Sequence, residues 1–240
     1  MDFINDFSDS RNKAWCIHCG TTLQSTKSNK DHVPSKSLLR TPPPPMLPTV
    51  RICQTCNESF SFDERYVATF IACVIVGSTE PGSHADKRTR ERLEKHPNLR
   101  ALIERSRVPY RTIGGDHRVV WRPDFNRINN VVLKNARGHA FYEFGEPMLA
   151  EPSSIATTPF DAMAPDERRD FESCEAGSLD VWPEVGSRAM QRLLTGQDME
   201  GPWVIVQDDV YRYSVSQHGS GLRVRTVISE YLATEVTWKS

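Results

Sequence analysis

The residues of this chain whose types and spacing point most clearly to chemistry are two Cys-x-x-Cys pairs, Cys16/Cys19 and Cys53/Cys56. Four thiols in two short pairs suit a tetrahedral zinc ion, because each pair can supply one edge of the tetrahedron. The segment between the pairs is longer than the roughly 15–20 residues found between the pairs of a common zinc ribbon. We therefore predict one structural zinc ion and a long inner loop with a further task.

The inner loop carries an acid–histidine pair, Asp31-His32, and Asn57 directly follows the last cysteine of the second pair. A purely structural zinc ribbon has no need for these polar side chains beside its metal. The loop is therefore predicted to have a chemical role of its own.

These stretches, Cys-x-x-Cys, Asp-His-x-x-Pro-x-Ser and Cys-x-x-Cys-Asn, resemble in their order the four-cysteine branch of the HNH endonucleases. The resemblance covers roughly residues 14–77, about a quarter of the chain. It implies a ββα-metal fold that cuts phosphodiester bonds with one divalent ion. It also implies that His32 is the general base and that Asp31 and Asn57 are oxygen ligands of the catalytic metal.

General chemistry agrees with these implied roles. A neutral imidazole, with a pKa of about 6.5, accepts a proton at cytoplasmic pH. Hard oxygen ligands suit Mg²⁺ or Mn²⁺, which neutralise charge on a scissile phosphate. One residue departs from the family pattern, because Pro48 and then Thr49 stand where the family has an asparagine that orients the histidine. A backbone carbonyl is the expected substitute, since that role needs only an acceptor.

Two acidic residues that follow Asn57 are further candidates for the metal site. Asn57, Ser61 and Glu64 fall on one face of a helix at seven-residue spacing, and Asp63 precedes Glu64. Either carboxylate could complete the catalytic metal site or hold a basic residue. The alternative is an ordinary solvated helix face.

Charge is distributed unevenly, although the net charge is −1. Residues 87–139 carry 14 Lys/Arg against 5 Asp/Glu, whereas residues 140–240 carry 8 against 17. The basic block is a candidate phosphate-facing surface, or a solvated exterior neutralised by the acidic third. The predicted nucleic-acid contacts are Lys36, Arg88, Arg92, Lys134 and Arg137. For Lys134 and Arg137 the alternative is a complement to the helix dipole, and for Lys36 it is plain solvation. His18 is expected to face solvent or to touch phosphate.

The pattern of apolar residues predicts the elements that must position these side chains. Strands are expected over 15–18 and 50–52, and a helix from Cys56 to a stop at Gly77. A second helix is predicted over 85–107 with an interruption at Pro97, then a strand over 117–121 and a helix from 123 that ends near Gly138.

The C-terminal part reads as β-rich. Residues 150–185 are rich in Pro, Ser, Asp and Glu and are interpreted as a linker, and 187–194 as a short helix. Four strands are predicted over 203–206, 210–215, 222–228 and 232–238. The predicted fold class is α+β. Its predicted parts are an N-terminal ββα-metal core with zinc knuckles (14–80), a basic helical extension (81–149) and an acidic region with a small antiparallel sheet (150–240).

The resulting hypothesis is a metal-dependent HNH endonuclease with structural Zn²⁺ and catalytic Mg²⁺ or Mn²⁺, acting on double-stranded DNA. The resemblance also suggests a role in anti-phage defence or in a mobile element. A non-catalytic zinc module that binds nucleic acid or protein is the alternative. A regulatory partner or a homo-oligomer stays open. No stretch approaches the 18 or so apolar residues of a membrane span, and no signal peptide is evident, so a cytoplasmic protein with reduced thiols is expected.

Overall fold

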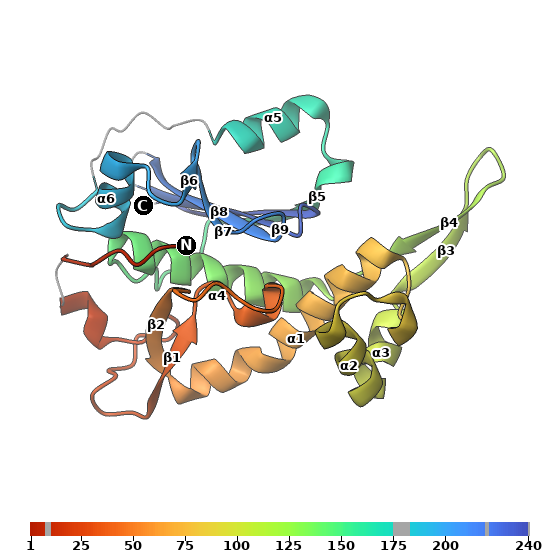
Figure 1. Ribbon diagram of the computed structural model, residues 1–240, viewed down its shortest axis with the longest axis horizontal. Helices are drawn as coiled ribbons and strands as arrows, with labels where there is room; N and C mark the ends of the chain where they lie inside the picture. Colours follow the sequence, from red (N-terminus) through yellow and green to blue (C-terminus); the bar gives the residue numbers. More distant parts are fainter. Residues whose placement is uncertain (8–10, 175–182, 219–220, 240) are drawn as a thin grey trace.

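The computed structural model describes residues 1–240 except 8–10, 175–182, 219–220 and 240. One long helix, α4, lies in the middle of the molecule (Figure 1). An antiparallel sheet covers one side of α4, and a strand–strand–helix unit that contains the cysteine pairs covers the other. Four short 3-10 helices complete the description: η1 Arg11–Ala14, η2 Lys36–Leu38, η3 Pro81–Ser83 and η4 Phe160–Ala162.

The strand–strand–helix unit confirms the elements predicted around the second cysteine pair. Strands β1 (Ser28–His32) and β2 (Thr49–Cys53) are antiparallel, and Asp31 lies opposite Val50. Helix α1 (Gln54–Val76) follows β2 without a loop and ends at Gly77, whose φ of 75° is left-handed as in many helix C-termini. The strand predicted over 15–18 was wrong, because only an isolated bridge between Trp15 and Thr22 forms there. The strand that pairs with β2 is β1, for which the sequence predicted no strand.

The predicted helix over 85–107 is replaced by two helices and the first strand of a hairpin. Helix α2 (Lys87–Lys95) ends at His96, and α3 (Pro97–Glu104) begins at the proline. Proline disfavours helical backbone in the residue before it and is well accommodated in a first helical turn, so the break falls at this position. Strands β3 (Arg107–Arg111) and β4 (His117–Trp121) then pair as a separate hairpin.

Helix α4 (Phe125–Phe144) does not end near Gly138 as predicted but continues to Gly145, which has a φ of 78°. Gly138 has a packing role instead. A Cβ atom built on it would lie 2.8 Å from Cγ2 of Val33, which directly follows β1. The missing side chain lets α4 approach the end of β1 closely.

Gly138→Ala is therefore expected to destabilise the protein, although alanine is the better helix former by about 1 kcal/mol. Overpacking of a close contact costs about 1–3 kcal/mol, and the short, branched Val33 side chain has little freedom to move away. Urea denaturation measures the change. Gly82→Ala is the control, because no atom lies within 4 Å of a Cβ there. The steric account also requires that Val33→Ala reduce the cost of Gly138→Ala; simple additivity of the two changes would contradict it.

The C-terminal sheet contains the four predicted strands: β7 (Trp203–Gln207), β8 (Tyr211–His218), β9 (Gly221–Ile228) and β10 (Leu232–Trp238). Its order is β5-β10-β9-β8-β7-β6, with two additional strands at the edges, β5 (Ser154–Pro159) and β6 (Met199–Glu200). The interpretation of 150–185 as a linker was wrong for β5 and for helix α5 (Pro165–Ser173). An edge strand with hydrogen bonds on one side only tolerates the Ser, Thr and Pro residues that resemble a loop in the sequence.

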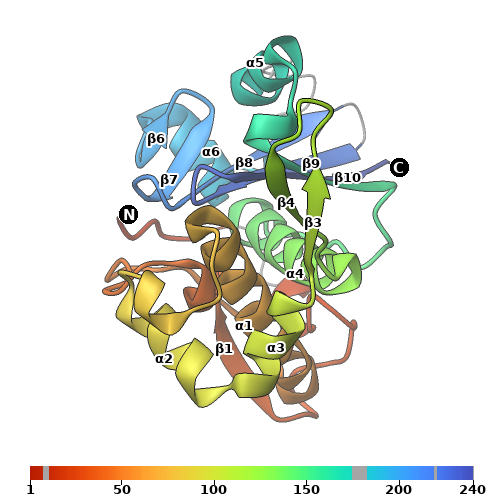
Figure 2. The ribbon, with the colours of Figure 1, turned by 90° about the vertical axis from the view of Figure 1, so that its right-hand side faces the viewer.

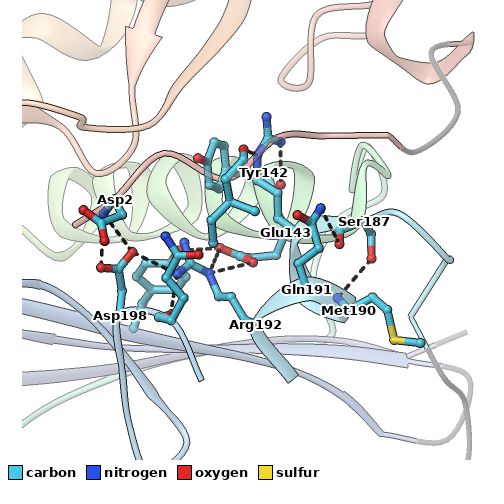
Figure 3. A network of polar contacts seen from close by, with 12 residues as sticks. Asp2, Tyr142, Glu143, Ser187, Met190, Gln191, Arg192 and Asp198 are labelled. Atoms are coloured by element: carbon cyan, nitrogen blue, oxygen red, sulfur yellow. Dashed lines mark hydrogen bonds and ion pairs between the residues drawn. The ribbon is translucent and has the colours of Figure 1, made fainter. Parts of the chain in front are cut away.

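A buried polar network joins α4 to the C-terminal region (Figure 3). The Glu143 carboxylate accepts hydrogen bonds from Arg192 Nε at 3.0 and 3.2 Å and from the Tyr213 hydroxyl at 2.5 Å. Arg192 belongs to α6 (Arg188–Thr195), which matches the short helix predicted there, and also pairs with Asp198 at 3.3 Å. Because each of these buried groups has a charged partner, the desolvation of the charges is offset.

The apolar core crosses both predicted domain boundaries. One cluster of buried side chains includes Tyr66 on α1, Ile103 on α3, Val131 on α4 and Val224 on β9. The three predicted segments therefore pack on one another around α4.

Candidate functional site

The four cysteines of the two pairs meet next to the junction of β2 and α1. Their sulfur atoms all lie within 4.8 Å of one another, and the Cys19 and Cys53 sulfurs are 3.7 Å apart. Zinc–sulfur bonds of about 2.3 Å in a tetrahedron place sulfurs about 3.8 Å apart, so the thiols fit one such ion. Burial raises the pKa of the Cys16 and Cys56 thiols, so their thiolates need a cation. The structure thus contains a four-cysteine site that could hold a structural zinc ion.

Asp31 faces α1 and α4, where a buried lysine pairs with it. Lys134 Nζ on α4 lies 3.0 Å from Asp31 Oδ1 and 2.8 Å from Oδ2, and it also pairs with the Glu64 carboxylate of α1. The Lys134 residue is only 3% exposed. Ser35 completes the cluster, because its hydroxyl lies 2.8 Å from Lys134 Nζ and 2.7 Å from Glu64 Oε1. We call Asp31, Ser35, Glu64 and Lys134 the Lys134 cluster.

The groups of the Lys134 cluster act on the pKa of Asp31 in opposite directions. Burial raises the pKa of Asp31, and the nearby Glu64 carboxylate raises it further, while Lys134 acts in the opposite direction. Two carboxylates share one ammonium group, and the positive charge of the ammonium offsets the free-energy cost of burying them.

The predicted acidic pair on α1 is divided between two partners. Asp63 forms an ion pair with Arg127 and accepts a hydrogen bond of 3.0 Å from Asn130 Nδ2, whereas Glu64 belongs to the Lys134 cluster. Both partners come from α4, where Arg127, Asn130 and Lys134 follow at three- and four-residue steps. Of the two roles predicted for these carboxylates, holding a basic residue is the one observed in both cases.

His32 is half-buried at the last position of β1. It directly follows Asp31, and the charges of Lys36, Asp31 and Lys134 all act on its imidazole. Burial lowers the pKa of His32, and Lys36 lowers it further, while Asp31 opposes them. Among the described residues, no group forms a hydrogen bond with the imidazole. A backbone carbonyl near Pro48 was expected to accept a bond from it, but the Pro48 carbonyl accepts a hydrogen bond of 2.9 Å from the Val33 amide instead.

Asn57 lies in the first turn of α1, half-buried and one residue after Cys56. Within the described part of the chain, its carboxamide makes no hydrogen bond, and no contact of that kind joins it to the Lys134 cluster. The structure thus brings Asp31 together with Glu64, and it leaves Asn57 and Asp63 out of that contact.

Two of the predicted nucleic-acid contacts point inward. Lys134 is buried in its cluster, and Arg137 is 7% exposed and donates to the carbonyls of His18, Leu149 and Ala150 at 3.2–3.4 Å. Their buried positions do not suit contacts with phosphate at a surface. They were expected at the surface because the helix was predicted to end next to them, near Gly138.

The other three predicted contacts lie nearer the surface. Lys36 is exposed. Arg88 is half-buried and donates to the Lys36 carbonyl at 2.8 Å, which holds the segment after β1 against α2. Arg92 is half-buried as well, and burial together with the charge of Arg88 lowers its pKa to about 10.

His18 is half-buried and does not face solvent as expected. Its ring packs edge-on against Phe60 with a centroid distance of 4.8 Å, and both ring nitrogens are buried without a hydrogen-bond partner among the described residues. Burial and the charges of Lys134 and Arg137 lower its pKa to about 3. The imidazole is therefore neutral beside the cysteine site.

The structural roles of Lys134 and Asn135 were not predicted. The Asn135 carboxamide oxygen accepts a hydrogen bond of 2.9 Å from the Ser35 amide. A signal existed in the helix itself. Polar residues interrupt an otherwise apolar sequence on every face of α4, from Ile128 to Phe144. The continuous buried run over residues 134–140 includes polar side chains, and buried polar groups need internal partners.

Lys134→Met is expected to lower the free energy of unfolding by about 3–5 kcal/mol, because it leaves buried carboxylates without their cation. Urea denaturation at neutral pH with zinc present measures the loss. Lys36→Met, at an exposed position, is the control and should change stability by no more than about 0.5 kcal/mol. Adding Asp31→Asn to Lys134→Met should restore part of the stability. A Lys134→Met protein as stable as the parent would contradict the role of the ammonium.

Comparisons with known proteins reveal no relative of this chain. No family of known proteins matches the sequence, and no curated protein or solved structure matches the chain. Among the described residues, no helix combines the length and apolar character needed to span a membrane.

Proposed function

We propose that this chain is a metal-dependent endonuclease of the HNH type that hydrolyses phosphodiester bonds in DNA. One observation carries the proposal. An acid–histidine pair ends the first strand of a strand–strand–helix unit whose base holds four clustered thiols, with an asparagine in the first helical turn. This local arrangement is what the order of the motifs in the sequence implies.

Asp31 and Asn57 would hold the catalytic Mg²⁺ or Mn²⁺, since carboxylate and carboxamide oxygens are ligands that such ions prefer. A bound ion would supply positive charge next to a scissile phosphate. The donor types fit, with one condition that the structure sets. Both Asp31 oxygens already lie within 3.0 Å of Lys134 Nζ, so an ion would have to share the carboxylate with the ammonium or displace it.

His32 is suited to accept a proton from an attacking water. Its lowered pKa keeps the imidazole neutral at neutral pH, and its ring is half exposed. Proton transfer by a positioned imidazole contributes about 10²–10⁴-fold to a hydrolytic rate. The close approach of Val33 to Gly138 fixes the backbone at the end of β1, next to His32.

Nicking of supercoiled plasmid DNA tests the proposal. Cleavage is expected with Mg²⁺ or Mn²⁺ and none after dialysis against EDTA, with zinc content measured in both samples to separate loss of structural metal from loss of catalysis. The same assay on RNA of matched length tests the choice of substrate. Absence of nicking with either ion by folded, zinc-loaded protein would overturn the proposal.

A non-catalytic zinc module is the second candidate, and the Lys134 cluster favours it. An ammonium group paired with Asp31 gives that carboxylate a structural role that needs no divalent ion. This candidate predicts folded, zinc-loaded protein that binds DNA or a protein and never cleaves DNA.

A further inference from the structure

The hairpin formed by β3 and β4 stands apart from the rest of the molecule. It projects beyond α3 in Figure 1, and Figure 2 shows the molecule from the side on which it projects. The register pairs Arg107 with Trp121 at the base and Arg111 with His117 near the tip. Five residues per strand correspond to a length of about 17 Å.

The hairpin exposes apolar side chains that no other element covers. Tyr110, Val119 and Val120 are exposed on its strands, and Ile113 is fully exposed at its tip. An isolated two-stranded hairpin is marginally stable in water, and exposed apolar side chains give it no burial of its own. These properties indicate a segment that a partner covers.

The charge of the hairpin identifies the kind of partner. Residues 105–122 contain one acidic residue, Asp116, and five arginines, which are Arg105, Arg107, Arg111, Arg118 and Arg122. Asp116 and Arg118 lie 4.0 Å apart with both side chains largely exposed, so the pairing is weak. Arg107, at the base of the hairpin, pairs with Glu104 at 2.7 Å. Beyond its base the hairpin is a positively charged projection.

Several other basic residues of the 87–139 block are engaged within the protein. Lys134 and Arg137 are buried, Arg127 pairs with Asp63, and Arg100 pairs with Glu80. Arg88 is tied to backbone carbonyls. On α2, Lys87 and Lys95 are exposed and share Glu91 as their partner. The exposed positive charge of this block therefore lies on the hairpin and on α2.

We propose that the β3–β4 hairpin binds double-stranded DNA, with its arginines on the phosphate backbone and its exposed apolar side chains in the groove. A two-stranded ribbon fits the major groove, which is about 12 Å wide. The hairpin is joined to α4 through Arg122, Pro123 and Asp124. The same helix carries Lys134, which pairs with Asp31 of the candidate site and lies nine residues after the first residue of α4, about 14 Å along its axis. The choice of DNA as partner rests on the proposed function, whereas the binding itself does not require cleavage.

Fluorescence anisotropy with a short labelled DNA duplex tests the hairpin, using His32→Ala protein so that the duplex stays intact. The logarithm of the affinity should fall with the logarithm of salt concentration by about 0.9 per phosphate contacted. Arg111→Gln/Arg118→Gln should weaken binding at low salt and reduce that slope by about 1.8. Arg168→Gln/Arg169→Gln on α5, which removes the same charge from exposed positions, is the control and should leave the slope unchanged.

Three results would overturn the proposal. Equal effects of the hairpin and α5 variants would mean that only net charge matters. Absence of DNA binding by the parent would exclude DNA as the partner of the hairpin. A parent dimer that the hairpin variant disrupts, with unchanged DNA affinity, would identify a second copy of the chain as the occupant. DNA cleavage and DNA binding are measured in separate assays. If the parent nicks DNA but the Arg111→Gln/Arg118→Gln variant has an unchanged salt slope, the hairpin proposal alone is overturned. If binding depends on the hairpin but the parent does not nick DNA, the nuclease proposal alone is overturned.

Discussion

Cys53→Ser is expected to yield insoluble or unfolded protein without bound zinc. Structural zinc in such sites supplies on the order of 10 kcal/mol of folding free energy, which equals or exceeds the stability of most domains. Cys53 also caps α1, since its sulfur accepts a bond of 3.4 Å from the Cys56 amide. Losing it therefore removes a metal ligand at the junction of β2 and α1. Metal analysis and circular dichroism of purified protein measure the outcome.

Cys174→Ala is the matched control, because this buried thiol lies outside the four-cysteine cluster. It should retain one zinc ion per chain and the parent spectrum. A folded Cys53→Ser protein with the spectrum of the parent, or a folded parent without zinc, would refute the assignment of the cysteine site.

His32→Ala is expected to lower the rate of DNA cleavage by about 10²–10⁴-fold while leaving zinc content and fold intact. The imidazole would be the base, and without it the attacking water loses its proton acceptor. The fold should tolerate the change, since the ring is half exposed and no described residue hydrogen-bonds to it. Single-turnover plasmid nicking with saturating Mn²⁺ measures the rate.

His96→Ala serves as the control for the loss of a histidine. His96 is also half-buried, at the junction of α2 and α3, and its only polar side-chain contact among the described residues is with Arg65 at 3.5 Å. The His96→Ala protein should cleave DNA at the parent rate. Cleavage at the parent rate by the His32→Ala protein would move the base elsewhere, and equal losses in both variants would indicate a general effect on the fold.

The prediction from sequence succeeded where the signal was local. Two Cys-x-x-Cys spacings, a short apolar strand and a helical repeat ending at Gly77 predicted β2, α1 and the cysteine site within one continuous stretch, whereas β1 was not predicted. The four strands from Trp203 to Trp238 follow one another in an antiparallel meander, so each pairs with its neighbour in sequence. Periodicity and turn residues are sufficient for such elements, because the contacts that stabilise them are close in the chain.

Prediction failed where a distant segment decides the structure. β5 forms because β10, more than 70 residues later, offers a free edge, and its own composition resembles a loop. No element was predicted over residues 108–111, which pair with β4 as part of β3.

By itself the sequence determined the residue types of the candidate site: the four thiols, the acid–histidine pair and the following asparagine. Only the tertiary structure determined which charges these residues meet. Lys134 pairs with Asp31 across 103 positions of sequence, because α4 lies between the cysteine unit and the sheet. A charge pattern cannot distinguish a basic residue on a surface from one inserted among acids, since burial depends on the packing of the whole chain.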